Sequence, residues 1–254
     1  MVVNPVRPDL KRDVADLEVI DYSLVEPVTE SIEAIKTMFG EDSEIYAIGY
    51  SLGSNHLLRH LGAHHDCKKV CGIRAAVSIS GCYDIRATCI ILKDRLFGMY
   101  DRYILSYLQE SFLKAKFRAT SRDPDFYTSH IKASKSLTDF DNRIRGPIFG
   151  YKGASRLFRN LSCDAFISSI ETPLLAISTK DDTITDYKFV PVDDLSRNPN
   201  VIFATLERGG HCNLWYESLT KNKTEHKELG PVLAIEFFNN AHDYYGQEQL
   251  IGSK

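Results

Sequence analysis

Apolar residues along this chain gather in short continuous runs, and segments with helical spacing separate those runs. Strands buried on both faces give continuous apolar runs, whereas helices repeat apolar positions three or four residues apart. The runs that predict strands are Glu44–Tyr50, Ile73–Ser80, Pro173–Thr179 and Asn200–Glu207. Because the runs alternate with helical segments, the pattern predicts an α/β fold with a mostly parallel sheet and flanking helices.

Two segments between these runs predict helices. From Pro27 to Phe39, apolar side chains recur on one face, Pro27 suits a first turn, and Gly40 suits an end. The second predicted helix runs from Ser54 to Leu61. Met1–Val3 is a possible additional strand stub.

A long segment without a convincing strand follows, from Ile90 to about Ile170. Apolar and aromatic residues recur there at helical spacing: Leu96, Tyr100, Tyr103, Ile104, Tyr107, Leu108, Phe112, Leu113 and Phe117. A helix packed on the core and a helical cap that lines an apolar pocket both fit this stripe. We therefore expect one domain over residues 1–254, with a helical cap segment inserted at residues 86–170.

Composition narrows the class of protein. The chain has 254 residues, 43% of them hydrophobic and 26% charged, which fits one globular domain with a sizeable core. A net charge of -3 gives no reason to expect a nucleic-acid partner. We expect a cytoplasmic protein, because no apolar run is long enough to span a bilayer and the start lacks a signal-peptide core. None of the six cysteines forms a C-x-x-C pair, so buried or idle thiols are expected.

The first candidate for chemistry is the segment Gly49-Tyr50-Ser51-Leu52-Gly53, a G-x-S-x-G pattern between a predicted strand and a predicted helix. In that setting the serine sits on a strained turn with its hydroxyl exposed. We expect side chains at Gly49 or Gly53 to clash with the adjacent strand and helix. Ser51 is thus either a nucleophile or an ordinary turn serine.

A serine nucleophile needs a base to take its proton and an acid to orient that base. Asp181 and Asp182 follow the predicted strand Pro173–Thr179, and His211 follows the predicted strand Asn200–Glu207. Both positions lie at the carboxyl edge of a parallel sheet, where catalytic groups gather. The chain order serine, acid, histidine is the one that this turn predicts. A turn-forming aspartate and an idle loop histidine are the alternatives.

No cofactor is implied, since the chain lacks phosphate-binding and dinucleotide fingerprints. His56, His60 and His64 lie four residues apart on and just beyond the second helix. A metal site and a solvated helical face are the two interpretations, and the lack of a matching carboxylate favours the solvated face.

The segments around these residues resemble the α/β-hydrolase superfamily and, within it, the YheT-like branch of medium-chain esterases, phospholipases and alcohol acyltransferases. "YAIGYSLGSNHLLRHLG" is similar to its nucleophile segment, and "NPNVIFATLERGGHCNLW" to its Asn-Pro-Asn-Val strand and Gly-Gly-His loop. "SLTDFDNRIRGPIFGYKGASRLFRNLSC" resembles its Thr-x-x-x-Phe-Asp stretch, and "ISSIETPLLAISTKDDTIT" its strand ending in Asp-Asp.

The resemblance implies a serine hydrolase of acyl esters without a cofactor, and the Phe/Tyr/Leu-rich cap segment favours a medium-chain or lipid-like substrate. It implies Ser51 as nucleophile, His211 as general base, Asp182 rather than Asp181 as the acid, and the backbone N–H of Leu52 as an oxyanion donor. Transfer of the acyl group to an alcohol would use the same residues.

The family also places several strands and a second oxyanion loop, often His-Gly, before the nucleophile. No His-Gly or Gly-Gly pair precedes Ser51, and "MVVNPVRP" resembles a family strand with Pro8 in place of glycine. The chain is thus expected to lack the N-terminal strands. Three alternatives remain: a gene fragment, a shortened protein that forms oligomers through an open sheet edge, or a non-catalytic remnant. A membrane anchor on an upstream segment also stays possible.

Overall fold

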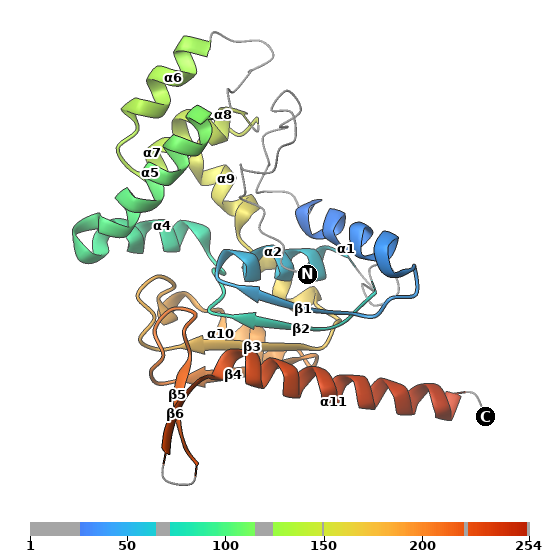
Figure 1. The fold of residues 1–254 in the computed structure, drawn as a ribbon. Helices are drawn as coiled ribbons and strands as arrows, with labels where there is room; N and C mark the ends of the chain where they lie inside the picture. Colours follow the sequence, from blue (N-terminus) through green and yellow to red (C-terminus); the bar gives the residue numbers. More distant parts are fainter. Residues whose placement is uncertain (1–25, 65–71, 115–123, 149, 221–222, 253–254) are drawn as a thin grey trace. The chain divides into compact units, whose positions relative to one another are not determined.

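The computed structural model describes residues 26–64, 72–114, 124–148, 150–220 and 223–252. The chain divides into two compact units. The helical unit contains Asp84–Leu161, and the sheet unit combines Val25–Tyr83 with Ser162–Lys254. Colour follows the sequence in Figure 1, so the helical unit runs from blue-green to yellow.

The sheet unit is built on four parallel strands in the order β1-β2-β3-β4. Their bounds are β1 Ile45–Tyr50, β2 Ile73–Ile79, β3 Leu174–Thr179 and β4 Val201–Leu206. All four predicted strands and the parallel α/β fold are therefore confirmed. The possible stub Met1–Val3 lies outside the described residues.

Helices cover both faces of this sheet (Figure 1). One face carries α1 Glu26–Phe39, α2 Leu52–Ala63, the 3-10 turn η4 Asp164–Ser169 and α10 Val192–Arg197. The other face carries the long helix α11 Leu229–Gly252. A 3-10 turn, η5, spans Tyr187–Phe189. The helix expected at Pro27–Phe39 is confirmed, and the one expected at Ser54–Leu61 begins two residues earlier and ends two later.

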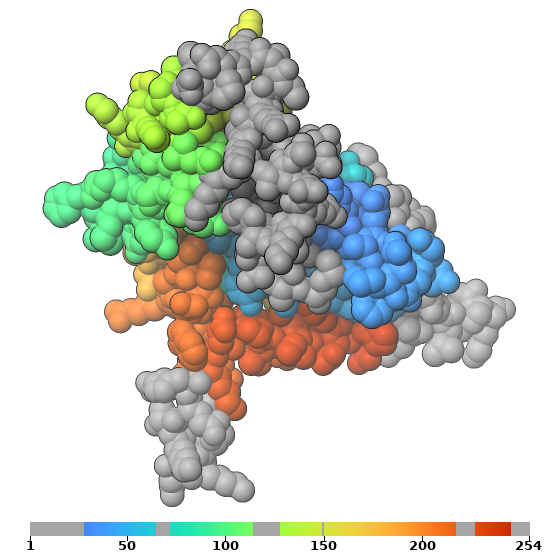
Figure 2. All heavy atoms as spheres, turned by 45° about the horizontal axis from the view of Figure 1, so that its top comes forward, coloured from blue at the N-terminus to red at the C-terminus, as the bar shows by residue number. Residues whose placement is uncertain are grey.

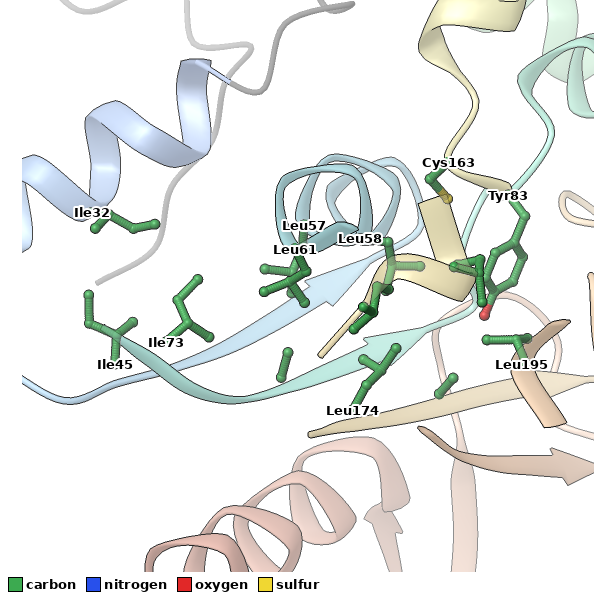
Figure 3. Close-up of a cluster of buried hydrophobic side chains, with 14 residues drawn as sticks. Ile32, Ile45, Leu57, Leu58, Leu61, Ile73, Tyr83, Cys163, Leu174 and Leu195 are labelled. Atoms are coloured by element: carbon green, nitrogen blue, oxygen red, sulfur yellow. The ribbon is translucent and has the colours of Figure 1, made fainter. Parts of the chain in front are cut away.

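Alternate residues of the buried strands supply two separate cores. Ala76 and Leu174 pack toward α1 and α2, while Val77 and Leu175 pack toward α11. Figure 3 shows the first core, where α2 sets its leucines against the strands. Side chains on successive strand positions point to opposite faces of the sheet. Because helices cover both faces here, the side chains on both faces must be apolar. This is why the strands could be predicted from continuous runs.

The helical unit contains no strand among its described residues. Its helices and helical turns are α4 Ile85–Asp94, η2 Arg95–Gly98, α5 Met99–Lys114, α6 Pro124–Ala133, α7 Leu137–Phe140, the π-helical turn η3 Asp141–Arg145, α8 Gly146–Ile148 and α9 Ala154–Leu161. Phe140 is fully buried and meets Phe112 edge to face, with ring centroids 5.1 Å apart. The unit therefore has a core of its own.

The apolar stripe predicted over Leu96–Phe117 is only partly right. Leu108 is buried, but Tyr103 is 74% exposed, and Leu105, outside the predicted stripe, is buried. The helix begins at Met99, and Leu96 lies in the preceding turn η2, so the spacing counted across Leu96 and Tyr100 does not belong to one helix. Phe117 lies outside the described residues.

A two-stranded antiparallel hairpin was not predicted. It joins β5 Trp215–Thr220 to β6 Lys223–Glu228, between the loop of His211 and α11. Its strands are largely polar and lack the continuous apolar run that marked the central strands. Across the described ranges, no helix combines the length and apolar character needed to cross a bilayer.

Candidate active site

Ser51 occupies a sharp turn between the end of β1 and the start of α2. Its φ of 51° and ψ of -117° are unusual for a residue with a side chain. Two backbone hydrogen bonds hold the turn: the Ser51 N–H donates to the Ile79 carbonyl (3.0 Å), and the Cys82 N–H donates to the Ser51 carbonyl (3.3 Å). Strain of this kind persists only where the surroundings fix it, and it is common at functional sites.

The first turn of α2 is tied to β2 by polar side chains. The Oγ atoms of Ser54 and Ser78 lie 2.5 Å apart and are fully buried. The Asn55 amide donates to the Cys82 carbonyl at 2.7 Å. Because Ser54 and Asn55 follow Ser51 closely in the chain, these bonds fix the direction in which the Ser51 hydroxyl leaves the turn.

The two glycines of the turn have different surroundings. A Cβ at Gly49 would lie 2.5 Å from the Ser54 Cα and 2.7 Å from its backbone N, so a side chain there would collide with α2. A Cβ at Gly53 would meet no described atom within 4 Å. The expected clash is therefore confirmed for Gly49 and wrong for Gly53, because Gly53 lies on an exposed part of the helix.

We expect Gly49→Ala to destabilise the sheet unit by about 1–3 kcal/mol or more, as overpacking does. Gly53→Ala is the matched control, and it should leave stability unchanged or raise it by up to about 1 kcal/mol because alanine favours a helix. Urea unfolding of both variants measures the difference. Equal effects of the two substitutions would contradict this view of the turn.

Asp182 follows β3 and is held by a tight turn of its own. Its Oδ1 accepts the N–H groups of Ile184 (2.7 Å) and Thr185 (2.9 Å), and its Oδ2 accepts the Thr185 hydroxyl (2.6 Å). Burial alone would raise the pKa of this carboxyl, but hydrogen bonds from His211 and Thr185 outweigh it and lower the pKa. Asp182 therefore stays ionised while only 2% exposed.

Its neighbour Asp181 has another role. Asp181 is exposed, and its Oδ1 accepts the Gly210 N–H at 2.9 Å. The Thr179 hydroxyl donates to the Gly210 carbonyl at 2.7 Å. Both bonds clamp the loop that precedes His211 onto the end of β3.

His211 lies between the other two predicted residues. Its Nδ1 is 2.8 Å from Asp182 Oδ2, and its Nε2 is 2.8 Å from Ser51 Oγ. These contacts join residues that follow three different parallel strands, β1, β3 and β4. When Nδ1 donates to the carboxylate, the neutral ring can accept the Ser51 proton at Nε2.

The charge of Asp182 shifts the proton affinity of the imidazole. Burial lowers the pKa of His211, but hydrogen bonds to Asp182 and Cys212 outweigh burial and raise the pKa to about 9. The raised pKa favours the imidazolium form, which cannot take a proton from Ser51, so we expect the base to become available as the pH rises.

We expect kcat/KM for a p-nitrophenyl ester to rise with pH through a midpoint near 9, because this parameter reports the free protein's essential base. The rate would be measured from about pH 6 to about pH 10, a range that includes the ordinary imidazole pKa. Ser51→Ala protein serves as the blank for alkaline hydrolysis of the substrate. A midpoint at the ordinary imidazole pKa would contradict the conclusion that Asp182 raises the pKa of His211.

No prediction from the sequence covered the residues that follow β2, although they lie at the same sheet edge. Cys82 is buried, and its Sγ is 3.6 Å from Ser51 Oγ. Ser80 accepts the Cys212 N–H at its Oγ (3.1 Å). Their position directly after a central strand could have identified them as residues near the candidate site.

Leu52 is the first residue of α2, where backbone N–H groups have no acceptor within the helix. The expectation that its N–H is an oxyanion donor rests on this position directly after Ser51.

The histidines of α2 are not on a solvated face. His56 and His60 are 4% and 1% exposed, because α2 is packed between the sheet, α1 and η4. Burial, followed by the charge of Arg59, lowers the pKa of His56 to about 4. No group of three or more potential metal ligands occurs among the described residues.

Comparisons with known proteins give several curated relatives, while no family model matches. The chain is 28% identical over 180 residues to the monoacylglycerol lipase of Saccharomyces cerevisiae, covering 68% of this chain and 38% of the relative. It is 26% identical over 196 residues to the embryogenesis-associated protein EMB8 of Picea glauca (74% and 41%). It is 26% identical over 167 residues to the phospholipase ABHD3 of Homo sapiens (65% and 39%). The chain spans less than half the length of each.

Solved structures give more distant matches. An esterase of Pyrococcus furiosus is 18% identical with a TM-score of 0.43, covering 74% of this chain and 53% of that one. Lipase A of Candida antarctica is 13% identical with a TM-score of 0.46, covering 76% and 51%.

Proposed function

We propose that this chain, a member of the α/β-hydrolase superfamily, is a serine hydrolase of carboxylic esters. The observation that carries the proposal is the pair of hydrogen bonds that connects Ser51 to His211 and His211 to Asp182. A base that is hydrogen-bonded to the serine, and an acid that orients the base, are what a serine nucleophile requires. The similarity to lipases and phospholipases points to the same class of reaction.

In the proposed reaction, Ser51 Oγ attacks the ester carbonyl while His211 Nε2 takes its proton. Asp182 holds the ring in the required tautomer and stabilises the imidazolium. The Leu52 N–H donates to the oxyanion of the tetrahedral intermediate. His211 then gives its proton to the departing alcohol, which leaves an acyl group on Ser51. Water, deprotonated by His211, releases the acid.

We further propose a medium-chain or lipid-like ester as the substrate. The relatives named for their substrates act on a monoacylglycerol and on phospholipids, which share a fatty acyl ester. The test is hydrolysis of p-nitrophenyl butyrate and octanoate by the full chain, with Ser51→Ala as the control. A folded chain that cleaves neither ester would contradict the proposal.

A second candidate function, association without catalysis, is favoured by one observation. In the described sheet, β1 has a single neighbour, β2, so one edge of β1 pairs with no other described strand. Ile48 on β1 is 40% exposed and Leu52 just beyond it is 38% exposed. Open strand edges are sites of association between chains. Light scattering separates the candidates: a stable dimer without esterase activity favours association, and an active monomer favours the hydrolase.

A further inference from the structure

The corner between α4 and α5 in the helical unit exposes large apolar side chains. We define the corner surface as Ile90, Leu96, Phe97, Met99 and Tyr103. Phe97 is 95% exposed, and the other four are between 48% and 74% exposed. The corner is the blue-green turn that joins α4 to α5 in Figure 1, and its atoms project in the same colour in Figure 2. Single exposed apolar residues are common, whereas several gathered at one corner mark an interaction site.

The backbone of the corner is strained at two of its exposed residues, Leu96 and Phe97. Leu96 (φ 46°, ψ 43°) and Phe97 (φ 54°, ψ 32°) both adopt the left-handed conformation, which is unfavourable for residues with a Cβ. The Arg102 guanidinium donates to the Phe97 carbonyl at 2.6 Å and fixes the turn. Gly98 follows with a φ of 72°, and a Cβ there would lie 3.0 Å from the Lys93 carbonyl. The fold therefore maintains a strained turn at the position where Leu96 and Phe97 are exposed to solvent.

The charges around the corner differ from those of the whole chain. Lys93 and Arg102 are exposed cations and Asp94 is an exposed anion, while Asp101 is buried. Two exposed cations therefore stand against one exposed anion in a chain whose net charge is -3. The corner surface therefore combines exposed apolar side chains with a small excess of positive charge beside them.

We propose that the corner surface docks on an anionic lipid membrane. Aromatic and aliphatic side chains inserted at the boundary of headgroups and acyl chains, with Lys and Arg beside the headgroups, are the chemistry of interfacial binding. A protein partner, such as a second copy of the chain, is the other outcome that the test distinguishes. The docking goes beyond the proposed function and does not require catalysis.

The test is sedimentation of the 254-residue chain with vesicles of phosphatidylcholine alone, or mixed with phosphatidylserine. Phe97→Gly removes the aromatic ring and suits the left-handed backbone, so a loss of binding is not a loss of folding. We expect Phe97→Gly to weaken binding to both vesicles by about tenfold or more. Lys93→Gln should weaken binding to the phosphatidylserine vesicles alone, by about fivefold.

Phe39→Ser is the matched control, because Phe39 is 73% exposed but lies on α1 in the sheet unit. It should leave vesicle binding unchanged. Absence of wild-type binding, or binding that Phe97→Gly does not weaken, would refute the docking. A dimer seen by light scattering and lost in Phe97→Gly would show instead that the corner pairs two copies.

The membrane docking and the proposed hydrolase function can be refuted independently of each other. Ser51→Ala should bind vesicles as the wild type does, so a chain that binds vesicles but cleaves no ester would refute only the hydrolase. A chain that cleaves soluble esters but ignores vesicles would refute only the docking.

Discussion

Replacing Ser51 by alanine should lower kcat for a p-nitrophenyl ester by about 10⁴- to 10⁶-fold, the range expected when a hydrolase loses its nucleophile. Without the Oγ atom, the imidazole of His211 has no proton to accept and no acyl-enzyme can form. Binding groups and the Leu52 N–H would remain, so a small residual rate is expected. Steady-state kinetics on the purified chain measure the loss.

Ser51→Gly separates chemistry from folding at the same position. Ser51 has a positive φ of 51°, which glycine adopts more readily than serine or alanine. The glycine variant should therefore unfold at the same temperature as the wild type or higher, and still be inactive. Retention of esterase activity in either variant would show that another group performs the attack.

Asp182→Asn should lower kcat by about 10⁴-fold, because it reverses the tautomer of the histidine. The asparagine oxygen can still accept the N–H groups of Ile184 and Thr185 at the position of Oδ1. Its amide nitrogen would then replace Oδ2 and donate toward His211 Nδ1. The ring would carry its proton on Nε2, where it cannot accept the proton of Ser51.

Asp181→Asn is the control for this prediction. Asp181 is exposed and accepts the N–H of Gly210, and an asparagine oxygen can accept the same bond. Its kcat should stay within a few-fold of the wild type. If the two substitutions had equal effects, the distinction between the paired aspartates would be wrong.

The central sheet could be predicted because each of its inner strands is apolar on both faces, as Ala76 and Val77 illustrate. The predicted site residues were brought together for a topological reason. In a parallel sheet the carboxyl ends of all strands meet at one edge, so Ser51, Asp182 and His211 could be placed near one another from the strand positions alone. Their hydrogen bonds depend on loop geometry, which the strand pattern does not contain.

Other features depend on tertiary context. His56 and His60 look like solvated residues in sequence, yet elements distant in the chain cover α2 on several sides. The hairpin β5–β6 has polar strands without an apolar period. At Leu96 and Phe97 the helical spacing is interrupted by left-handed backbone, which the residue types alone do not favour.

Labelling with a fluorophosphonate probe tests most directly whether Ser51 is activated by His211 and Asp182. Intact mass spectrometry of the wild-type chain should show one covalent adduct, located on the peptide that contains Ser51. The adduct should be absent in Ser51→Ala and form much more slowly in Asp182→Asn. A folded wild-type chain that takes no label at any pH, or that still takes it after Ser51→Ala, would contradict the account.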